Sequence, residues 1–324
     1  MLNKENDNNP LLAIISATFD KTATADLNNY YLKATAEISK WTCYSDYCFD
    51  DPNKPNNVVC FTLIPYVQDF ESLSRHIKSL AAVDIKKTRK VQEEFTTFLK
   101  EYPLVNFSFI LTDRKRLLGK DYAGVINFLH TTYTLMRDQY KLWSKNQPEQ
   151  KEQYLRIIKK INCLLTLIEQ RKKIPQIIDM TLVTFYGAYV SSRIINNGNI
   201  ESFGWFSDRD ALNEVCDYFS IDLFRYYLHG LTEGIDFNFF AAAAGSKDNP
   251  FYEDLVRIPD YIAGALADYN SVDNVVSKDK FNTMLTNYMA DNIHNNFVFR
   301  LFTVDEGLAS SRITIQRTPE DESD

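Results

Sequence analysis

The sequence lacks the short motifs that mark several common catalytic centres. It contains no glycine-rich phosphate loop, no HExxH and no GxSxG. None of its four histidines has a spacing to cysteines or carboxylates that singles it out as a base or a metal ligand. We therefore expect any catalytic site to use other residue types.

Cysteines and long hydrophobic runs are also scarce. The five cysteines form no CxxC pair, and their odd number does not describe a disulfide framework, so a reducing cytoplasm is the simplest location. The polar N-terminus, MLNKENDNNP, lacks the apolar core of a secretory signal. The longest apolar run, FNFFAAAAG, is too short to span a bilayer, and we expect no membrane segment.

The chain has no excess of positive charge. Asp and Glu number 43 against 36 Lys and Arg, which argues against a protein that coats nucleic acid through its overall field. Local basic segments at 84–90, 113–116 and 171–173 are candidates for a groove, although such runs are more often solvated faces.

What the chain does have is apolar content for a large core, at 45% hydrophobic residues over 324 positions. Apolar residues at alternating positions predict strands, and those at helical spacing predict helices. The expected strands are 11–20, 58–67, 104–113, 200–207 and about 235–244, with the region 30–47 undecided. The expected helices are one or two within 68–100, then 121–145, 149–173, 175–198, 208–230 and one from Pro259.

This order predicts an α/β fold with a mixed sheet flanked by helices and a helical insertion. We divide the chain into a polar leader at 1–10, the N-terminal part of the core at 11–113 and the insertion at 114–175. The C-terminal part of the core follows at 176–305, and a polar acidic tail at 306–324.

One segment, RIPDYIAGALADYN, places Asp260 beside a proline at the expected start of a helix. Ala263, Gly264 and Ala267 would give this helix a face of small residues that can lie close to another element. Helix capping alone is an alternative reason for Asp260.

Two further acids fall at the ends of expected strands, where open α/β sheets place ligands. Asp20 ends the segment 11–20, and Asp208 follows the strand 200–207 in GWFSDRDAL. Ser207 and Asp210 also have the spacing of a capping box, so helix capping explains part of this second cluster.

Together these features resemble an uncharacterised RNase H-like family with an acidic first strand and a final helix beginning (A/P)DxxAG. The matching residues are Pro259, Asp260, Ala263 and Gly264. The resemblance covers about 11–113 and 176–270 and implies Asp20, Asp208 and Asp260 as metal ligands, with Asp179 as a fourth carboxylate. The chain departs from the family on the first strand, where it has SATFDKT in place of an Asp-Glu-Ser-Gly-like run.

Converging carboxylates favour Mg²⁺ or Mn²⁺, and two such ions would support phosphodiester cleavage of nucleic acid. In this hypothesis Asp179 or Asp210 assists, while Lys247 and Arg209 neutralise a phosphate. Two other hypotheses stay open. The DxDxxL pattern is similar to an aspartyl-nucleophile phosphatase, with Asp208 as nucleophile and Asp210 as acid/base. Alternatively, the chain is a catalytically inactive RNase H-like scaffold that binds a protein partner.

Overall fold

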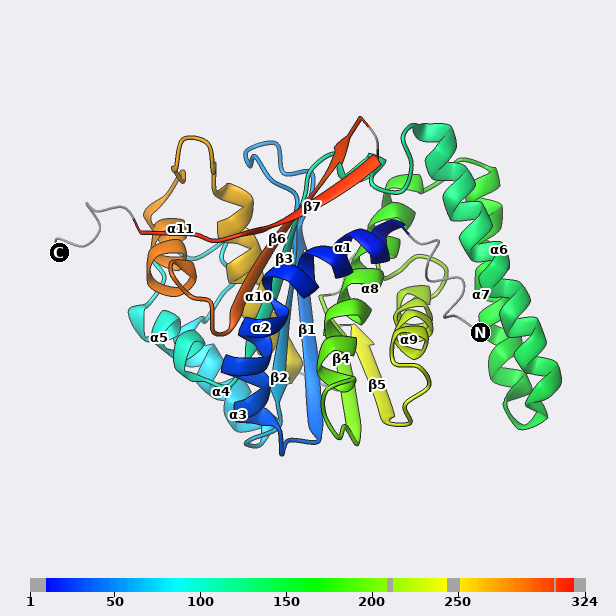
Figure 1. The fold of residues 1–324 in the computed structure, drawn as a ribbon, viewed down its shortest axis with the longest axis horizontal. Coiled ribbons are helices and arrows are strands. Elements are labelled where there is room, and N and C mark those ends of the chain that lie inside the picture. Colours follow the sequence, from blue (N-terminus) through cyan, green and yellow to red (C-terminus); the bar gives the residue numbers. More distant parts are fainter. Residues whose placement is uncertain (1–9, 209–211, 244–250, 306, 318–324) are drawn as a thin grey trace.

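The computed structural model describes residues 10–208, 212–243, 251–305 and 307–317. Its centre is a seven-stranded mixed sheet in the order β5-β4-β1-β2-β3-β6-β7, with helices on both faces (Figure 1). The α/β class predicted from the sequence is confirmed. The strands are β1 (Lys40–Cys48), β2 (Val58–Pro65), β3 (Val105–Leu111), β4 (Ser202–Ser207), β5 (Asn238–Ala243), β6 (Asn296–Val304) and β7 (Gly307–Ile313).

Most strands point the same way. β1 runs parallel to β4, β4 to β5, and β3 to β6, whereas β2 is antiparallel to both β1 and β3. β7 is antiparallel to β6. The carboxyl ends of β1, β3, β4, β5 and β6 therefore meet at one edge of the sheet, which is where α/β folds place ligands.

Helices cover the two faces of the sheet unequally. The front face in Figure 1 packs against α1 (Pro10–Thr22), α8 (Ile174–Ile195), α9 (Phe219–Leu231) and the hairpin formed by α6 (Tyr122–Asn146) and α7 (Lys151–Glu169). The other face packs against α4 (Phe70–Leu80), α5 (Glu93–Glu101), α10 (Phe251–Asp268), α11 (Asp279–Met284) and the π-helix Leu285–Met289. The remaining short elements are α2 (Thr24–Asp26), the π-helix Leu27–Leu32, α3 (Lys33–Thr35) and the 3₁₀ turns Arg114–Arg116 and Pro148–Gln150.

Residues along β1 alternate between these faces, as the period of a strand requires. Cys43 belongs to the cluster beneath α1 and α8, whereas Tyr44 and Cys48 belong to the cluster beneath α10. Ser45 accepts a hydrogen bond of 3.0 Å from the indole of Trp205 on the first of these faces. Asp46, which lies between Tyr44 and Cys48 in this alternation, therefore faces α10.

The prediction of a strand at 11–20 is wrong, because these residues form helix α1. Leu11, Ile15 and Phe19 are spaced by four and are buried against the sheet, so the apolar period is helical. The far end of the sheet holds α1 in place: Thr18 Oγ1 donates to the Ser310 carbonyl at 3.3 Å, and Ser310 Oγ donates to the Ile14 carbonyl at 3.1 Å.

Three other boundaries differ from the sequence expectation. The last long helix begins at Phe251, so Pro259 and Asp260 lie inside it rather than at its start. Residues 212–218 form turns, and the helix expected from 208 begins only at Phe219. Part of the expected acidic tail forms the strand β7. Among the helices of the described ranges, none combines the length and apolarity that crossing a bilayer requires.

Candidate functional site

Two carboxyl groups meet between the sheet and α10. Asp46, near the carboxyl end of β1, is half-buried and forms a side-chain hydrogen bond with Asp260 of α10. Asp260 Oδ2 also accepts a hydrogen bond of 2.8 Å from the Ile85 backbone N–H. The candidate site is therefore built on Asp46 and Asp260, which come from the two elements that the sequence hypothesis asked for, a first strand and a late helix.

The environment of Asp260 favours its protonated form. Burial raises the pKa of Asp260 to about 6, and the negative charge of Asp84 acts in the same direction. The hydrogen bonds from Ile85 and Asp46 and the positive charge of Lys86 oppose this increase in pKa. Two adjacent acids with one pKa near neutrality are typical of groups that share a proton or a cation.

Hydrogen bonds from side chains along one side of α10, called the stripe below, hold the loop between α4 and α5 in place. Arg257 donates to the Ala81 carbonyl at 2.7 Å, and the Tyr261 hydroxyl donates to the Val83 carbonyl at 2.8 Å. Asp260 lies between these contacts, and Gly264 is one turn further along the same stripe. Each contact joins α10 to this loop, so the stripe fixes the position of the Ile85 N–H that bonds to Asp260.

Lys280 holds the same loop from the other side. It is buried, and its ammonium group donates to the carbonyls of Ile85, Lys86 and Thr88, the last at 3.0 Å. Lys54 donates to the Gly264 carbonyl at 3.2 Å. Lys280 and Lys86 therefore place positive charge near Asp260.

Gly264 is required where α10 passes this loop. A Cβ at position 264 would lie 2.6 Å from Cγ2 of the fully buried Ile85.

We expect Gly264→Ala to lower the free energy of unfolding by roughly 1–2 kcal/mol, because overpacking outweighs the better helix propensity of alanine. In an Ile85→Ala background the same change should stabilise by up to about 1 kcal/mol. Urea denaturation of all four proteins measures this reversal, and additive effects would contradict the close contact.

Asp208 lies at the same edge of the sheet. Ser207 pairs in register with Ser45, so Asp208 and Asp46 are the next residues on adjacent parallel strands. Asp208 is exposed, and its carbonyl accepts a hydrogen bond of 2.6 Å from the Asn213 side chain. Within the described ranges, however, no three His, Cys, Asp or Glu side chains lie close enough together to hold a metal ion.

Asp20 and Asp179 lie on the opposite face of the sheet from Asp260. Asp20 is on α1, where its carboxylate is 3.3 Å from a guanidinium nitrogen of Arg193. Asp179 is on α8 and forms an ion pair with Arg114. The structure therefore does not bring either acid to Asp260, and the expectation that Asp20 is the first-strand acid is wrong. Asp210, Arg209 and Lys247 lie outside the described residues.

Arg114 was expected within a basic segment but is buried. Its guanidinium contacts Asp179 on α8 and donates a hydrogen bond of 2.7 Å to Asp50, which follows β1. The same group lies 4.3 Å from the ring centre of Phe49. Since Arg114 itself follows β3, it joins the carboxyl ends of two strands to a helix.

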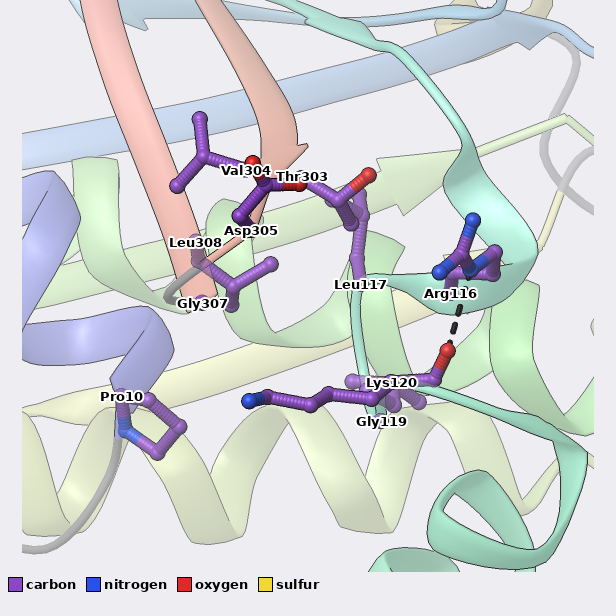
Figure 2. Close-up of a pocket in the computed structure, with 11 residues that line it drawn as sticks. Pro10, Arg116, Leu117, Gly119, Lys120, Thr303, Val304, Asp305, Gly307 and Leu308 are labelled. Atoms are coloured by element: carbon purple, nitrogen blue, oxygen red, sulfur yellow. Dashed lines mark hydrogen bonds between the residues drawn. The ribbon is translucent and has the colours of Figure 1, made fainter.

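A separate pocket of about 400 Å³ lies where the chain leaves β3 and where β6 turns into β7 (Figure 2). Arg116, Lys120 and Asp305 are its charged lining residues, and Arg116 Nε donates to the Lys120 carbonyl at 3.1 Å. The Lys120 side chain extends towards Pro10 of α1. This pocket shares an edge of the sheet with Asp46, but no acid of the sequence hypothesis lines it.

Comparison of the chain with protein-family models, with curated proteins and with solved structures finds no match.

Asp46 is the residue that sequence reasoning missed. It lies in KWTCYSDYC, where β-branched and aromatic residues do not decide between a strand and another structure. Thr42, Tyr44, Asp46 and Cys48 share one face, and Asp46 is the acid among them. Recognising β1 as the first strand would have pointed to Asp46, because its register beside β4 leads directly to Asp208.

Proposed function

We propose that this protein is a metal-dependent phosphodiesterase of RNase H-like type that acts on nucleic acid. The observation that carries the proposal is the contact between Asp46 of β1 and Asp260 of α10, with the pKa of Asp260 raised by burial. Asp208 is the third acid of the proposal. It follows the strand beside β1, and Phe206, two residues earlier, packs on the face that holds α10.

The strand order supports the RNase H-like part of the proposal. In the series β3-β2-β1-β4-β5, only β2 is antiparallel to its neighbours. This is the order expected of an RNase H-like sheet, with the first-strand acid on β1 and the last acid on a helix that packs over it. β6 and β7 extend the sheet beyond β3.

The donor set fits a hard divalent cation. Asp46 and Asp260 offer carboxylate oxygens in contact with each other, which Mg²⁺ and Mn²⁺ prefer and which repel one another when both are ionised. Such an ion would polarise the phosphate and activate water. The protein's own residues hold the two carboxylates in place through Ile85 and the α4–α5 loop, and Lys54 and Lys86 supply positive charge for a phosphodiester backbone.

We expect Asp46→Asn and Asp260→Asn each to reduce Mg²⁺- or Mn²⁺-dependent cleavage by more than about a hundredfold, because each removes a carboxylate from the donor set. The measurement is cleavage of end-labelled single-stranded and double-stranded DNA and RNA at pH 8. Asp138→Asn is the matched control, since Asp138 is an exposed acid on α6 that pairs with Lys141. Loss of cleavage in Asp20→Asn but not in Asp46→Asn would overturn the assignment.

Cation binding has a readout besides cleavage. Mn²⁺ should raise the Tm of the unaltered protein, and Asp46→Asn should remove most of this increase. A Tm that does not respond to Mg²⁺ or Mn²⁺, together with no cleavage, would favour the inactive scaffold that binds a protein partner. Cleavage that depends on Asp208 while Asp46 and Asp260 are dispensable would favour the aspartyl phosphatase.

We also propose a cytoplasmic location, in keeping with the free thiols of Cys43, Cys48 and Cys60.

A further inference from the structure

Two thiols meet where the helical hairpin packs beside the segment that follows β4. Sγ of Cys163 on α7 lies 2.6 Å from Sγ of Cys216, well inside the contact distance of two non-bonded sulfur atoms. Cys163 is exposed and Cys216 is partly buried. We propose that Cys163 and Cys216 are a redox-modification site that forms a reversible disulfide, with a peroxide as oxidant and a dithiol as reductant.

An independent contact holds α7 against α9, the helix that directly follows the turn containing Cys216. Lys160, three residues before Cys163, forms an ion pair of 2.9 Å with Asp222 of α9. Positions three apart share one face of a helix, so α7 presents both side chains to the same neighbour. Both partners of the ion pair are largely buried, at 25% and 20% side-chain exposure. The approach of the two sulfur atoms is therefore part of a packed interface.

The backbone on the other side of this contact is unusual. Cys216, Asp217 and Tyr218 have φ angles of 47°, 60° and 55°, three consecutive non-glycine residues in the left-handed region. Such residues persist only where the surrounding structure determines them. This turn holds Cys216 at α7, and the two cysteines are 53 positions apart in sequence.

The chemistry needs one oxidant equivalent. Cys163, the exposed thiol, attacks the O–O bond of hydrogen peroxide and gives a sulfenic acid and one water. Cys216 Sγ then attacks the Cys163 sulfur, the S–O bond breaks, and the hydroxyl leaves as a second water with the Cys216 proton. Two thiols lose two electrons and the peroxide gains them. Cys163 reacts first because it is exposed to the peroxide, whereas Cys216 is partly buried and burial raises the pKa of its thiol.

The disulfide would tie the hairpin to the strand end that carries Asp208. The side chain of Asn213, in the same turn segment as Cys216, donates to Ser207 Oγ at 2.9 Å and to the Asp208 carbonyl at 2.6 Å. The bond itself can form whether or not the proposed nuclease activity exists.

The test is oxidation of the reduced full-length protein with hydrogen peroxide, followed by titration of thiols in denaturant. We expect the thiols to fall from five to three, and non-reducing peptide mapping to join Cys163 to Cys216 with loss of two hydrogens. The Tm should rise by several degrees and return after treatment with dithiothreitol, since the bond closes a long loop of the unfolded chain.

Matched variants separate this bond from general oxidation. Cys163→Ser should keep all four remaining thiols, whereas Cys216→Ser should lose at most the Cys163 thiol, as a sulfenic acid; neither variant should form the intramolecular bond or show a rise in Tm. Cys60→Ser, which replaces a buried thiol on β2, should still form the bond. Five thiols after oxidation, a bond to another cysteine, or cross-linking only between molecules would each overturn the proposal.

Discussion

Replacing Arg114 with methionine should lower the free energy of unfolding by about 4 kcal/mol. Arg114 is 2% exposed, and Asp179 retains only 15% of its side-chain exposure. Methionine fills similar volume but leaves the Asp179 carboxylate in the interior without its counterion. Most of the cost is the penalty of this uncompensated charge. Urea denaturation, followed by far-UV circular dichroism, measures the change.

Two further variants test the cause of this loss. Asp179→Asn in the Arg114→Met background removes the buried carboxylate charge that has lost its counterion. This change should recover more than half of the lost stability. Lys115→Met is the control, because Lys115 also lies 3.3 Å from Asp50 but is 57% exposed. Exposed ion pairs contribute little, so we expect a change below about 0.5 kcal/mol. Equal losses for Lys115→Met and Arg114→Met would show that burial of the guanidinium is irrelevant.

Asp260→Asn should raise the free energy of unfolding by up to roughly 3 kcal/mol at pH 8. The pKa of Asp260 is raised from 3.8 to about 6 in the folded protein, mainly by burial, so ionising the folded state is harder than ionising the unfolded chain. Its contribution to stability is present below the unfolded pKa and is lost as pH rises through the folded pKa. Asparagine carries no charge at any pH, and its side-chain oxygen can still accept the Ile85 N–H.

The pH dependence is the decisive measurement. The advantage of Asp260→Asn should grow between about pH 4 and pH 7 and then level off, while below about pH 4 it should be largely absent. Asp138→Asn again serves as control, on an exposed helix face. A constant difference at all pH values would mean that the charge of Asp260 is not the cause. A variant that gains stability and loses cleavage fits a site where function is maintained at the expense of stability.

The sequence was sufficient for the α/β class and for most elements, because their apolar periods are long and regular. Helices α6, α7 and α8 and strands β2, β3 and β4 lie where periodicity predicted them. It failed at 11–20, where Leu11, Ile15 and Phe19 fit a helix while Ile14, Ser16 and Thr18 fit a strand. A short apolar segment satisfies both periods, and only packing across the sheet decides between them.

The sequence predicted one of the two acids of the candidate site, Asp260, but not its partner. The small residues around Asp260 indicated a closely packed helix, and α10 does pack against β1 and the α4–α5 loop. The sequence hypothesis assigned the wrong partner to Asp260, because contacts between distant segments do not produce a local sequence pattern. The aromatic residues near Asp46 in the sequence do not indicate which residue it contacts. Likewise, the run DRKR indicates solvated charge, although burial between β3 and α8 makes Arg114 an internal counterion.

The contact between α1 and β7 has a consequence for how the chain is made. Thr18 and Ser310, which join these elements, are 292 positions apart. A ribosome that adds roughly 5–20 residues per second needs about 15–60 s to reach β7 after it has made α1. During that time the apolar side of α1 cannot reach Phe299 or β7, although it packs against the former in the finished protein. The apolar side of α1 can pack on Phe107 and Tyr189 earlier, but it is not fully covered until β6 and β7 have been made, so this helix is among the last elements to be completed.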